Sequence, residues 1–300
     1  MATQHGREIW RVSAFTDQPY TGNPAGVVPH AEGLNNEQMQ AIAAELNDLS
    51  ETAFITPDSL GDADIRLRYF TSTLEVDLCG HVTMAALFTL AWTGRVTGRD
   101  ERRTLRARTP VGVLELGLEF AGDRLEWATM EQLEPEHAPA PGADLAAKVL
   151  GLDPADLASD LEVRCASTGI WACFVPLKNL DALARVNIQP PLIQALWPDN
   201  DELSGVYAFA FRDDKTTQGR FFSPPKFGIF EDPVTGTASG ALGAYLMAQE
   251  RLGEDEQLLA HQGVEMGRPG RVRVQRNANG RMSISGQATP IFRGHLLTDD

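Results

Sequence analysis

The pattern of apolar and polar positions predicts alternating strands and helices in the first half of the chain. Apolar residues three and four apart predict a helix over residues 36–46, and an Ala-rich apolar run after His81 predicts a second helix that ends near Gly94. Alternation and β-branched or aromatic residues predict strands. The predicted strands are residues 10–15, a segment that follows a turn within 21–28, then 51–56 and 64–71, and a meander of 104–108, 112–120 and 124–128.

The second half repeats this kind of pattern after a change in composition. Residues 130–161 are rich in Pro, Glu and Ala, and they contain the predicted domain boundary, before a helix at about 143–150. The pattern then predicts strands at 164–166, 172–177 and 205–212 and a closing hairpin across 277–280.

Two stretches 156 residues apart resemble each other. RYFTS (68–72) precedes the first glycine-led helix, and RFFSP (220–224) precedes the second. Sliding the chain by this offset pairs Glu75 with Glu231, Cys79 with Thr235, Gly80 with Gly236, Thr83 with Ser239 and Ala85 with Ala241. The same order of aromatic strand, acidic turn, glycine, small polar residues and Ala-rich helix therefore predicts a duplicated α/β unit.

The glycine-led helix starts suggest a site for an anion. The first N–H groups of a helix have no intrahelical partners, and the helix dipole places partial positive charge there. A glycine at the entry lets a carboxylate or phosphate approach the backbone closely. Gly80 or Gly236 alone would be explained as a turn residue, but two such starts in a duplicated fold favour a ligand cleft between the halves.

Other readings of Cys79 and His81 are less favoured. Two candidate ligands without a partner pair elsewhere make a poor zinc site, so we predict no metal. Residues i and i+2 rarely face each other at a helix start, which argues against a nucleophile and base. The chain contains no GxSxG, GxGxxG or GxxxxGK pattern, so we predict no nucleotide cofactor.

Composition and charge indicate which kinds of partner and which cellular compartment to expect. A net charge of −15, with acidic residues scattered along the 300 residues, disfavours nucleic acid and anionic membranes as partners. The N-terminal MATQHGREIW does not read as a signal peptide, and no apolar run approaches the ~20 residues that span a bilayer. Three cysteines without framework spacing predict no disulfides. We therefore expect a cytoplasmic protein with reduced thiols.

Five blocks in order resemble the phenazine-biosynthesis PhzF-like isomerases, relatives of diaminopimelate epimerase. The blocks are AFTDQPYTGNPAGVV, MQAIAAELNDLSETAFI, RYFTSTLEVDLCGHVTMAAL, EDPVTGTASGAL and GQATPIFRGHLL. The resemblance implies a diaminopimelate-epimerase-like α/β (α+β) fold with two similar domains, each a curved sheet around a central helix, and a site between them. It places residues 1–128 plus about 289–300 in one domain and 129–288 in the other. It also implies a homodimer, a small carboxylated substrate and no cofactor.

The family's site residues fall on particular positions of this chain. The resemblance makes Glu51 the catalytic carboxylate, with His81 and Asp232 as further catalytic residues. The substrate-binding positions that it implies are Asn23, Gly80, Gly236 and Thr237. From the residues alone, a helix-terminal glutamate such as Glu51 would more often face water, although burial would raise its pKa and suit it to proton transfer.

Diaminopimelate epimerase uses two cysteines on opposite faces of an α-carbon, and this chain has only one of them. Cys79 stands at the first helix start, but Thr235 stands at the second, and a threonine does not replace a thiolate. We therefore predict that Glu51 removes a proton and returns it to another carbon on the same face, and that Cys79 only packs or lines the site. An epimerase or racemase, or a non-catalytic binding homologue, remains an alternative.

Overall fold

The structure, a computed structural model, describes residues 6–46, 51–197, 203–225 and 230–297. The chain divides into one unit of Met1–Met130 with Ser285–Asp300 and another of Glu131–Ile284. The two units are described separately below. Within the described residues, no helix is both long enough and apolar enough to cross a bilayer.

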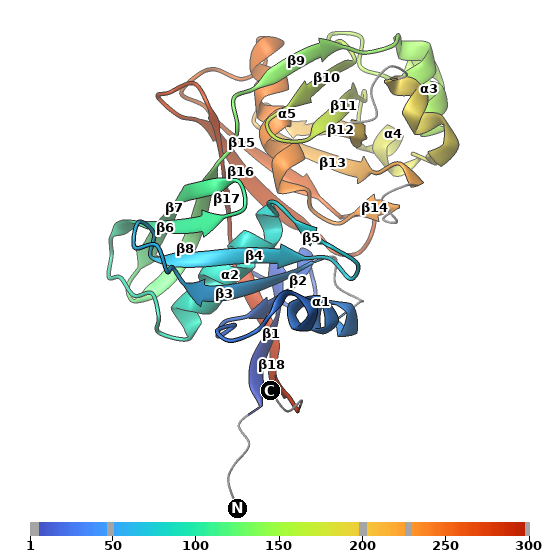
Figure 1. The fold of residues 1–300 in the computed structure, drawn as a ribbon. Helices are drawn as coiled ribbons and strands as arrows, with labels where there is room; N and C mark the ends of the chain where they lie inside the picture. The colour runs from blue at the N-terminus through green and yellow to red at the C-terminus, as the bar shows by residue number, and fades with distance from the viewer. Residues whose placement is uncertain (1–5, 47–50, 198–202, 226–229, 298–300) are drawn as a thin grey trace, which may run out of the picture. The chain divides into compact units, whose positions relative to one another are not determined.

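The first unit is a curved sheet with a buried helix (Figure 1). Its strands are β1 (Arg7–Ala14), β2 (Asn23–Val28), β3 (Thr52–Pro57), β4 (Ile65–Phe70), β5 (Glu75–Val76), β6 (Arg102–Thr109), β7 (Gly112–Ala121), β8 (Arg124–Glu131) and β18 (Ala288–Leu296). β18, β1 and β2 pair antiparallel, β2 and β3 parallel, and β3 and β4 antiparallel. β4 continues antiparallel to β5 and parallel to β6, and β6, β7 and β8 form the predicted meander.

The helices of this unit are α1 (Asn36–Glu45) and α2 (Gly80–Trp92). α1 begins with a capping box, in which the Asn35 side chain accepts from Gln38 N and the Gln38 side chain accepts from Asn35 N. α2 is buried at every position from His81 to Leu90 and packs against β1, β2, β3 and β18. A helix that is apolar all round must be enclosed, so α2 is the central helix of the unit.

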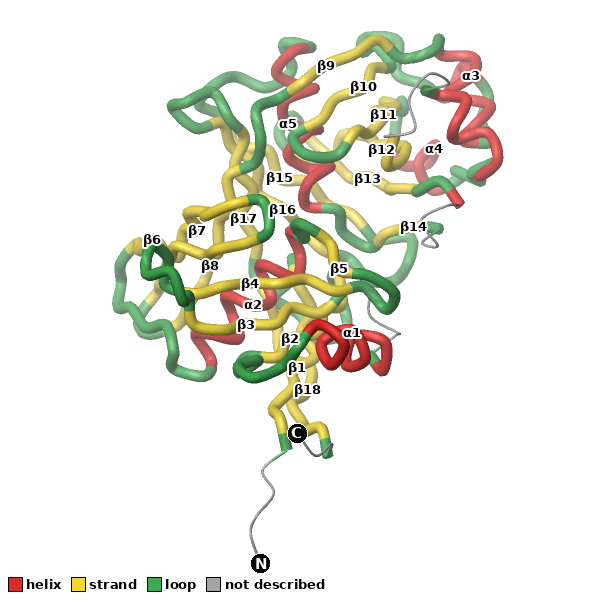
Figure 2. The backbone as a smooth tube through the Cα atoms, viewed as in Figure 1, coloured by secondary structure: helices red, strands yellow, loops and turns green. Residues whose placement is uncertain are grey.

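The second unit has the same plan. Its elements are β9 (Glu136–Pro139), α3 (Ala143–Leu150), η1 (Pro154–Asp156), β10 (Arg164–Ser167), β11 (Trp171–Pro176), α4 (Leu180–Ala184), η2 (Pro190–Leu196), β12 (Leu203–Asp213), β13 (Thr216–Phe222), β14 (Glu231–Asp232), α5 (Gly236–Ala248), β15 (Gln257–Gln262), β16 (Gly270–Arg276) and β17 (Met282–Gly286). α5 is buried from Ala238 to Leu246 and packs against β10, β11 and β16. Figure 2 shows α2 and α5 in red among the yellow strands of their own units.

The strand pairings confirm the duplication that the 156-residue offset predicts. β9 and β10, and β10 and β11, pair antiparallel, whereas β11 and β12 pair parallel. β12 and β13 pair antiparallel, and β13 then runs antiparallel to β14 and parallel to β15, which pairs antiparallel with β16. This is the order found for β18, β1 and β2 to β7. α2 and α5 each have 13 residues, and each follows a two-residue strand.

An arginine–glutamate pair fixes the strand before each central helix. In the first unit, Arg68 Nε and Nη2 donate to the two carboxylate oxygens of Glu75 at 2.7 and 2.6 Å. In the second, Arg220 Nε and Nη2 donate to those of Glu231 at 2.8 and 2.9 Å. Such bidentate pairs have a defined geometry, so they hold β5 on β4 and β14 on β13.

Several local predictions are confirmed. α3 spans the predicted residues 143–150, α1 falls within the predicted 36–46, and Asn277 N donates to Arg281 O at 2.7 Å in the predicted closing turn. The patterns did not predict β9, α4 or β15. These elements are short or polar, and they owe their structure to neighbouring strands and to the core between α3 and β12.

The two arginine–glutamate pairs predict different stability losses. Glu231→Gln should lower the free energy of unfolding by about 3 kcal/mol, because Arg220 would keep its charge in a site where both side chains are about one-tenth exposed. Glu75→Gln should cost about 1 kcal/mol, because water reaches the Glu75 side chain, which is 34% exposed. Urea unfolding followed by circular dichroism measures both losses. Equal losses, or a larger loss at Glu75, would contradict this ranking.

Candidate functional site

Glu51 directly precedes β3, and a bond to β2 holds its backbone. Gly26 N, on β2, donates to Glu51 O at 3.1 Å, and Thr52 then pairs with Gly26. The Glu51 side chain is 18% exposed, and its Oε2 atom is buried. Among the described residues, no group donates a hydrogen bond to Oε2. A buried carboxylate oxygen in this state is unusual, and it marks Glu51 as a candidate for chemistry.

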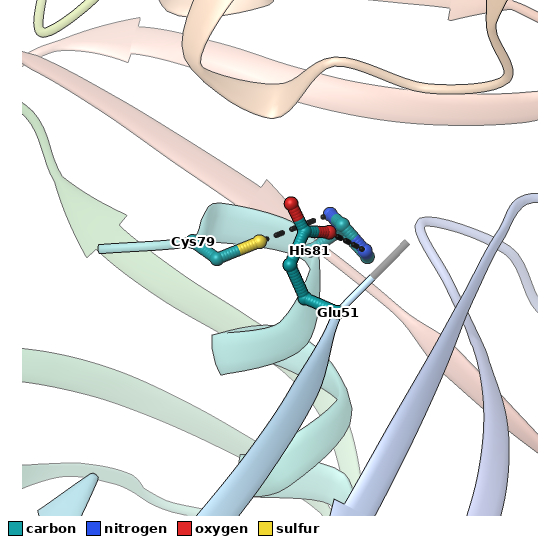
Figure 3. Close-up of side chains that lie close together, drawn as sticks. All are labelled: Glu51, Cys79 and His81. Carbon is teal, nitrogen blue, oxygen red and sulfur yellow. Dashed lines mark hydrogen bonds and ion pairs between the residues drawn. The ribbon is translucent and has the colours of Figure 1, made fainter. Parts of the chain in front are cut away.

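His81 contacts both Glu51 and Cys79 through its two ring nitrogens (Figure 3). Its Nε2 is 3.4 Å from Glu51 Oε2, and its Nδ1 is 3.3 Å from Cys79 Sγ. In one tautomer the thiol donates to Nδ1, and the Nε2–H is on the side of the carboxylate, although the contact with Oε2 does not meet hydrogen-bond geometry. The imidazole therefore connects the two other groups.

The prediction that Cys79 and His81 would not face each other is wrong. Cys79 is the N-cap of α2 and has extended backbone angles, φ −142° and ψ 115°. The spacing rule for residues i and i+2 holds for two residues inside a helix. Because Cys79 precedes the first helical residue, its side chain turns back towards the His81 ring.

The structure places a carboxylate, a third type of metal ligand, beside Cys79 and His81. The sequence did not show this proximity. One donor atom from each of Glu51, Cys79 and His81 lies within 4.8 Å of the other two. Thiolate, imidazole and carboxylate are the ligands that zinc accepts in proteins. The reasoning that counted only Cys79 and His81 therefore missed a carboxylate brought from another element by the sheet.

A buried hydroxyl pair supports the start of α2. Thr83 Oγ1 donates to the Cys79 carbonyl at 2.7 Å and lies 2.9 Å from Tyr69 Oη. Since the single Thr83 proton goes to the carbonyl, Tyr69 must be the donor of the second bond. Burial raises the pKa of Tyr69 above its usual value, so its hydroxyl keeps that proton.

Asp232 belongs to the corresponding turn of the second unit. Thr235 Oγ1 donates to Asp232 Oδ2, and the Gln262 amide joins both ends of the turn. Gln262 Nε2 donates to Asp232 O at 2.7 Å and to Thr235 Oγ1 at 3.1 Å, while its Oε1 accepts from Thr235 N at 3.2 Å. Because a backbone carbonyl only accepts and a backbone N–H only donates, these contacts fix the orientation of the amide.

Thr168 and Gln132 lie within hydrogen-bond distance of the backbone carbonyls of Thr237 and Gly236 at the start of α5. Thr168 Oγ1 lies 2.6 Å from Gln132 Oε1 and 3.2 Å from Thr237 O, and Gln132 Nε2 is 3.5 Å from Gly236 O. A Cβ at Gly240 would lie 1.7 Å from Gln132 Oε1, so glycine is required for this contact. Sequence reasoning missed Gln132, Thr168 and Gln262, because isolated polar residues carry no signal of burial.

The remaining predicted residues are placed as follows. Gly80 is the first residue of α2, directly between Cys79 and His81. Asn23 is 1% exposed at the first position of β2, the strand that pairs with β3 after Glu51. The structure thus gathers Glu51 and His81 in the first unit. Asp232, Gly236 and Thr237 lie in one turn and helix start of the second, and a ligand shared by the two units stays a prediction.

Comparisons with known proteins identify the family. A family model described as "Phenazine biosynthesis-like protein" (PhzC-PhzF) matches residues 12–294. The chain is 36% identical over 293 residues to the uncharacterized isomerase YfhB of Bacillus subtilis, covering 95% of this chain and 96% of YfhB. It is 31% identical over 290 residues to the trans-2,3-dihydro-3-hydroxyanthranilate isomerase of Pseudomonas aeruginosa, covering 94% of this chain and 96% of that protein.

Solved structures agree on the fold. The PhzF-family phenazine biosynthesis protein of Bacillus anthracis superposes with a TM-score of 0.86 at 32% identity, covering 97% of this chain and 99% of that one. A hydroxyproline epimerase from Agrobacterium vitis superposes with a TM-score of 0.64 at 13% identity, covering 100% and 95%, which shows a shared fold alone. With two epimerase-like units and a family match over nearly its whole length, the chain belongs to the PhzC-PhzF family of phenazine biosynthesis-like proteins.

Proposed function

We propose that this protein is an isomerase that moves a proton between two carbons of a small carboxylated substrate without a cofactor, with Glu51 as the proton shuttle. The observation that carries the proposal is the Glu51 carboxylate, whose buried Oε2 receives no hydrogen bond from the described residues and lies 3.4 Å from His81 Nε2. The names of the relatives support the reaction class, since several are called isomerases.

A general base must be held in place while still reaching a proton on the substrate. The Glu51 backbone is held by Gly26, within β2, and its side chain is partly exposed. The carboxylate can therefore take a proton from a carbon and return it to another carbon on the same face. His81, at the adjacent helix start, would stabilise the Glu51 carboxylate before the proton is taken and after it is returned, and would hold a polar group of the substrate.

The helix starts would bind the substrate's carboxylate. Neither N-cap side chain, Cys79 or Thr235, makes a cap hydrogen bond to its helix, and the Thr235 hydroxyl is committed to Asp232. The first N–H groups at Gly80 and Gly236 therefore suit an anion and would stabilise negative charge that develops in the reaction. Thr237 would add a hydroxyl, and Asn23 would form part of the wall.

Asp232 would contact the amino or hydroxyl group of the substrate. Its turn is held through Thr235 and the buried Gln262, so the carboxylate is presented on a rigid support. The name of the Pseudomonas aeruginosa relative suggests a first compound to test, trans-2,3-dihydro-3-hydroxyanthranilate. Small cyclic amino and hydroxy acids extend the panel.

A second candidate function is an epimerase or racemase, and the position of Cys79 favours it. Its thiol lies 3.3 Å from His81 Nδ1, in the same cluster as Glu51. Exchange with inversion needs groups on two sides of an α-carbon, so the Cys79 thiol and the Glu51 carboxylate, which lie within 4.8 Å of each other, would have to move apart to flank it. In deuterated water, inversion with deuterium at the retained stereocentre would favour this function over the isomerase.

Glu51→Gln provides the sharpest test of the shuttle. Glutamine keeps the size of the side chain but accepts no proton, so turnover, or hydrogen exchange between substrate and deuterated water, should fall by about 10²–10⁴-fold. Ligand affinity should change little, because the proposed carboxylate site is made of backbone N–H groups. NMR of the substrate in deuterated water measures the exchange, and calorimetry measures the affinity.

A matched control separates this effect from a general loss of charge. Glu115 is exposed on β7, and Glu115→Gln removes the same charge from the same unit. Its exchange rate should equal that of the wild type. A Glu51→Gln enzyme that exchanges hydrogen as fast as this control would rule out the shuttle.

Cys79→Ser distinguishes the two candidate functions. Under the Glu51 mechanism, activity should fall by no more than about tenfold, because serine can still donate to His81 Nδ1 and the main base remains. Under a thiol-based mechanism, activity should fall by about 10³-fold or more, since a serine hydroxyl is a far weaker base. Initial rates of the same exchange reaction decide between these outcomes.

A further inference from the structure

We propose that Glu51, Cys79 and His81 form a binding site for a soft divalent cation such as Zn²⁺, and that the bound ion inhibits the enzyme. The inhibition rests on the proposed role of Glu51, whereas the binding does not. Three donors of different chemistry, contributed by β3 and by the start of α2, come together here. Among the residues that the structure describes, this is the one cluster of at least three such side chains with metal-binding spacing.

Two of the donor pairs are spaced like neighbouring ligands of a tetrahedral site. Zinc bonds of 2.0 to 2.3 Å at tetrahedral angles place neighbouring ligand atoms about 3.4 to 3.6 Å apart. Cys79 Sγ is 3.3 Å from Nδ1 of His81, and Nε2 of the same ring is 3.4 Å from Glu51 Oε2. An ion takes only one ring nitrogen, so the two distances do not belong to one coordination sphere. One donor atom from each residue lies within 4.8 Å of the other two, and the Glu51 carboxylate must move closer to complete a site with Cys79 and that nitrogen.

The elements that carry the ligands leave little freedom beyond that movement. Cys79 and His81 are fixed by the first turn of a buried helix, and the Cys79 carbonyl accepts a bond from Thr83. The backbone of Glu51 is tied to β2. Ligands on such elements are organised before the ion arrives. Zinc binds Cys as thiolate, so the ion displaces the thiol proton to water and takes over the position between sulfur and imidazole.

Occupation of this site would block proton transfer. A carboxylate bound to a metal has its basic lone pair engaged, so Glu51 could not remove a proton from carbon. The three protein ligands leave a fourth position, which water or the substrate's own carboxylate can fill. A substrate bound in that way would be held away from the base. The ion therefore acts as an inhibitor, and removing it restores the enzyme.

Cobalt titration tests the site directly. Co²⁺ added to the chain, with a phosphine reductant in place of thiols, should bind one equivalent and produce the near-ultraviolet absorption of a thiolate–cobalt bond. Cys165 and Cys173 are fully buried, so this band reports on Cys79. Zn²⁺ should displace the cobalt and abolish the band. Absence of the band at one equivalent would overturn the proposal.

Substitution of the proposed ligands shows where the ion binds. Cys79→Ser should remove the band, and both it and Glu51→Gln should weaken Zn²⁺ binding by at least about tenfold, since the loss of outer-shell partners alone costs 10- to 100-fold. Cys165→Ala, which removes a thiol outside the cluster, should leave the band and the affinity unchanged. Unchanged affinity in Cys79→Ser would place the ion elsewhere and reject the site.

Inhibition is measured separately from binding. In the wild type, hydrogen exchange should fall in proportion to the cobalt band, and EDTA should restore both. A full cobalt band with undiminished hydrogen exchange would reject the proposed inhibition but not the proposed binding site. Failure of Glu51→Gln to reduce exchange would reject the shuttle but not the metal titration, so the two proposals fail independently.

Discussion

The need to satisfy the starts of two buried helices organises this protein. α2 and α5 are enclosed over most of their length, so the N–H groups of their first turns lie close to the interior. Neither helix begins with a side-chain cap, and glycine stands at the first helical position of both. A helix end without a cap needs another partner, such as a ligand. Buried polar side chains accordingly lie at both starts: His81 and Thr83 at α2, and Gln132, Ser239 and Gln262 at α5.

The duplication accounts for the contacts that the two units share, and sequence differences account for the different residues at their helix starts. Each unit holds its short acidic strand with an arginine–glutamate pair and places a hydroxyl in the first turn of its central helix, at Thr83 or Ser239, to bond the N-cap carbonyl. The N-cap residues differ. The first unit has the buried Cys79, and the second has Thr235 bonded to Asp232. The shared contacts stabilise both helix starts, which leaves the other positions able to change without loss of the fold.

The contacts of His81 with a carboxylate and a thiol link the proposed activities of the site. The same ring can stabilise the charge of Glu51, orient the Cys79 thiol, or give up a nitrogen to a metal ion. The first two roles use different ring nitrogens and can coexist, whereas a metal ion would take a nitrogen from one of them. Competition for His81 would therefore connect the proposed proton transfer with the proposed inhibition.

The sequence by itself determined the elements that depend on local pattern. The 3–4 spacing of apolar residues predicted α1, the Ala-rich runs predicted the buried helices, and the 156-residue offset predicted that the units share one topology. The order of the short motifs also indicated the family, and the family's catalytic position fell on Glu51. Motifs and their order can be read directly from the chain without knowledge of the fold. The pairing of Asn277 with Arg281 followed from local turn chemistry in the same way.

Only the tertiary structure decided which of these side chains meet. Glu51 and His81 are 30 residues apart, and the sheet beside α2 brings them within 3.4 Å. The orientation of Cys79 depended on the extended backbone of an N-cap, which helical periodicity does not describe. Gln262 and Gln132 became identifiable only when their burial and partners were known. Periodicity records which face of an element is apolar, whereas contacts across elements depend on strand pairing that is not local in the sequence.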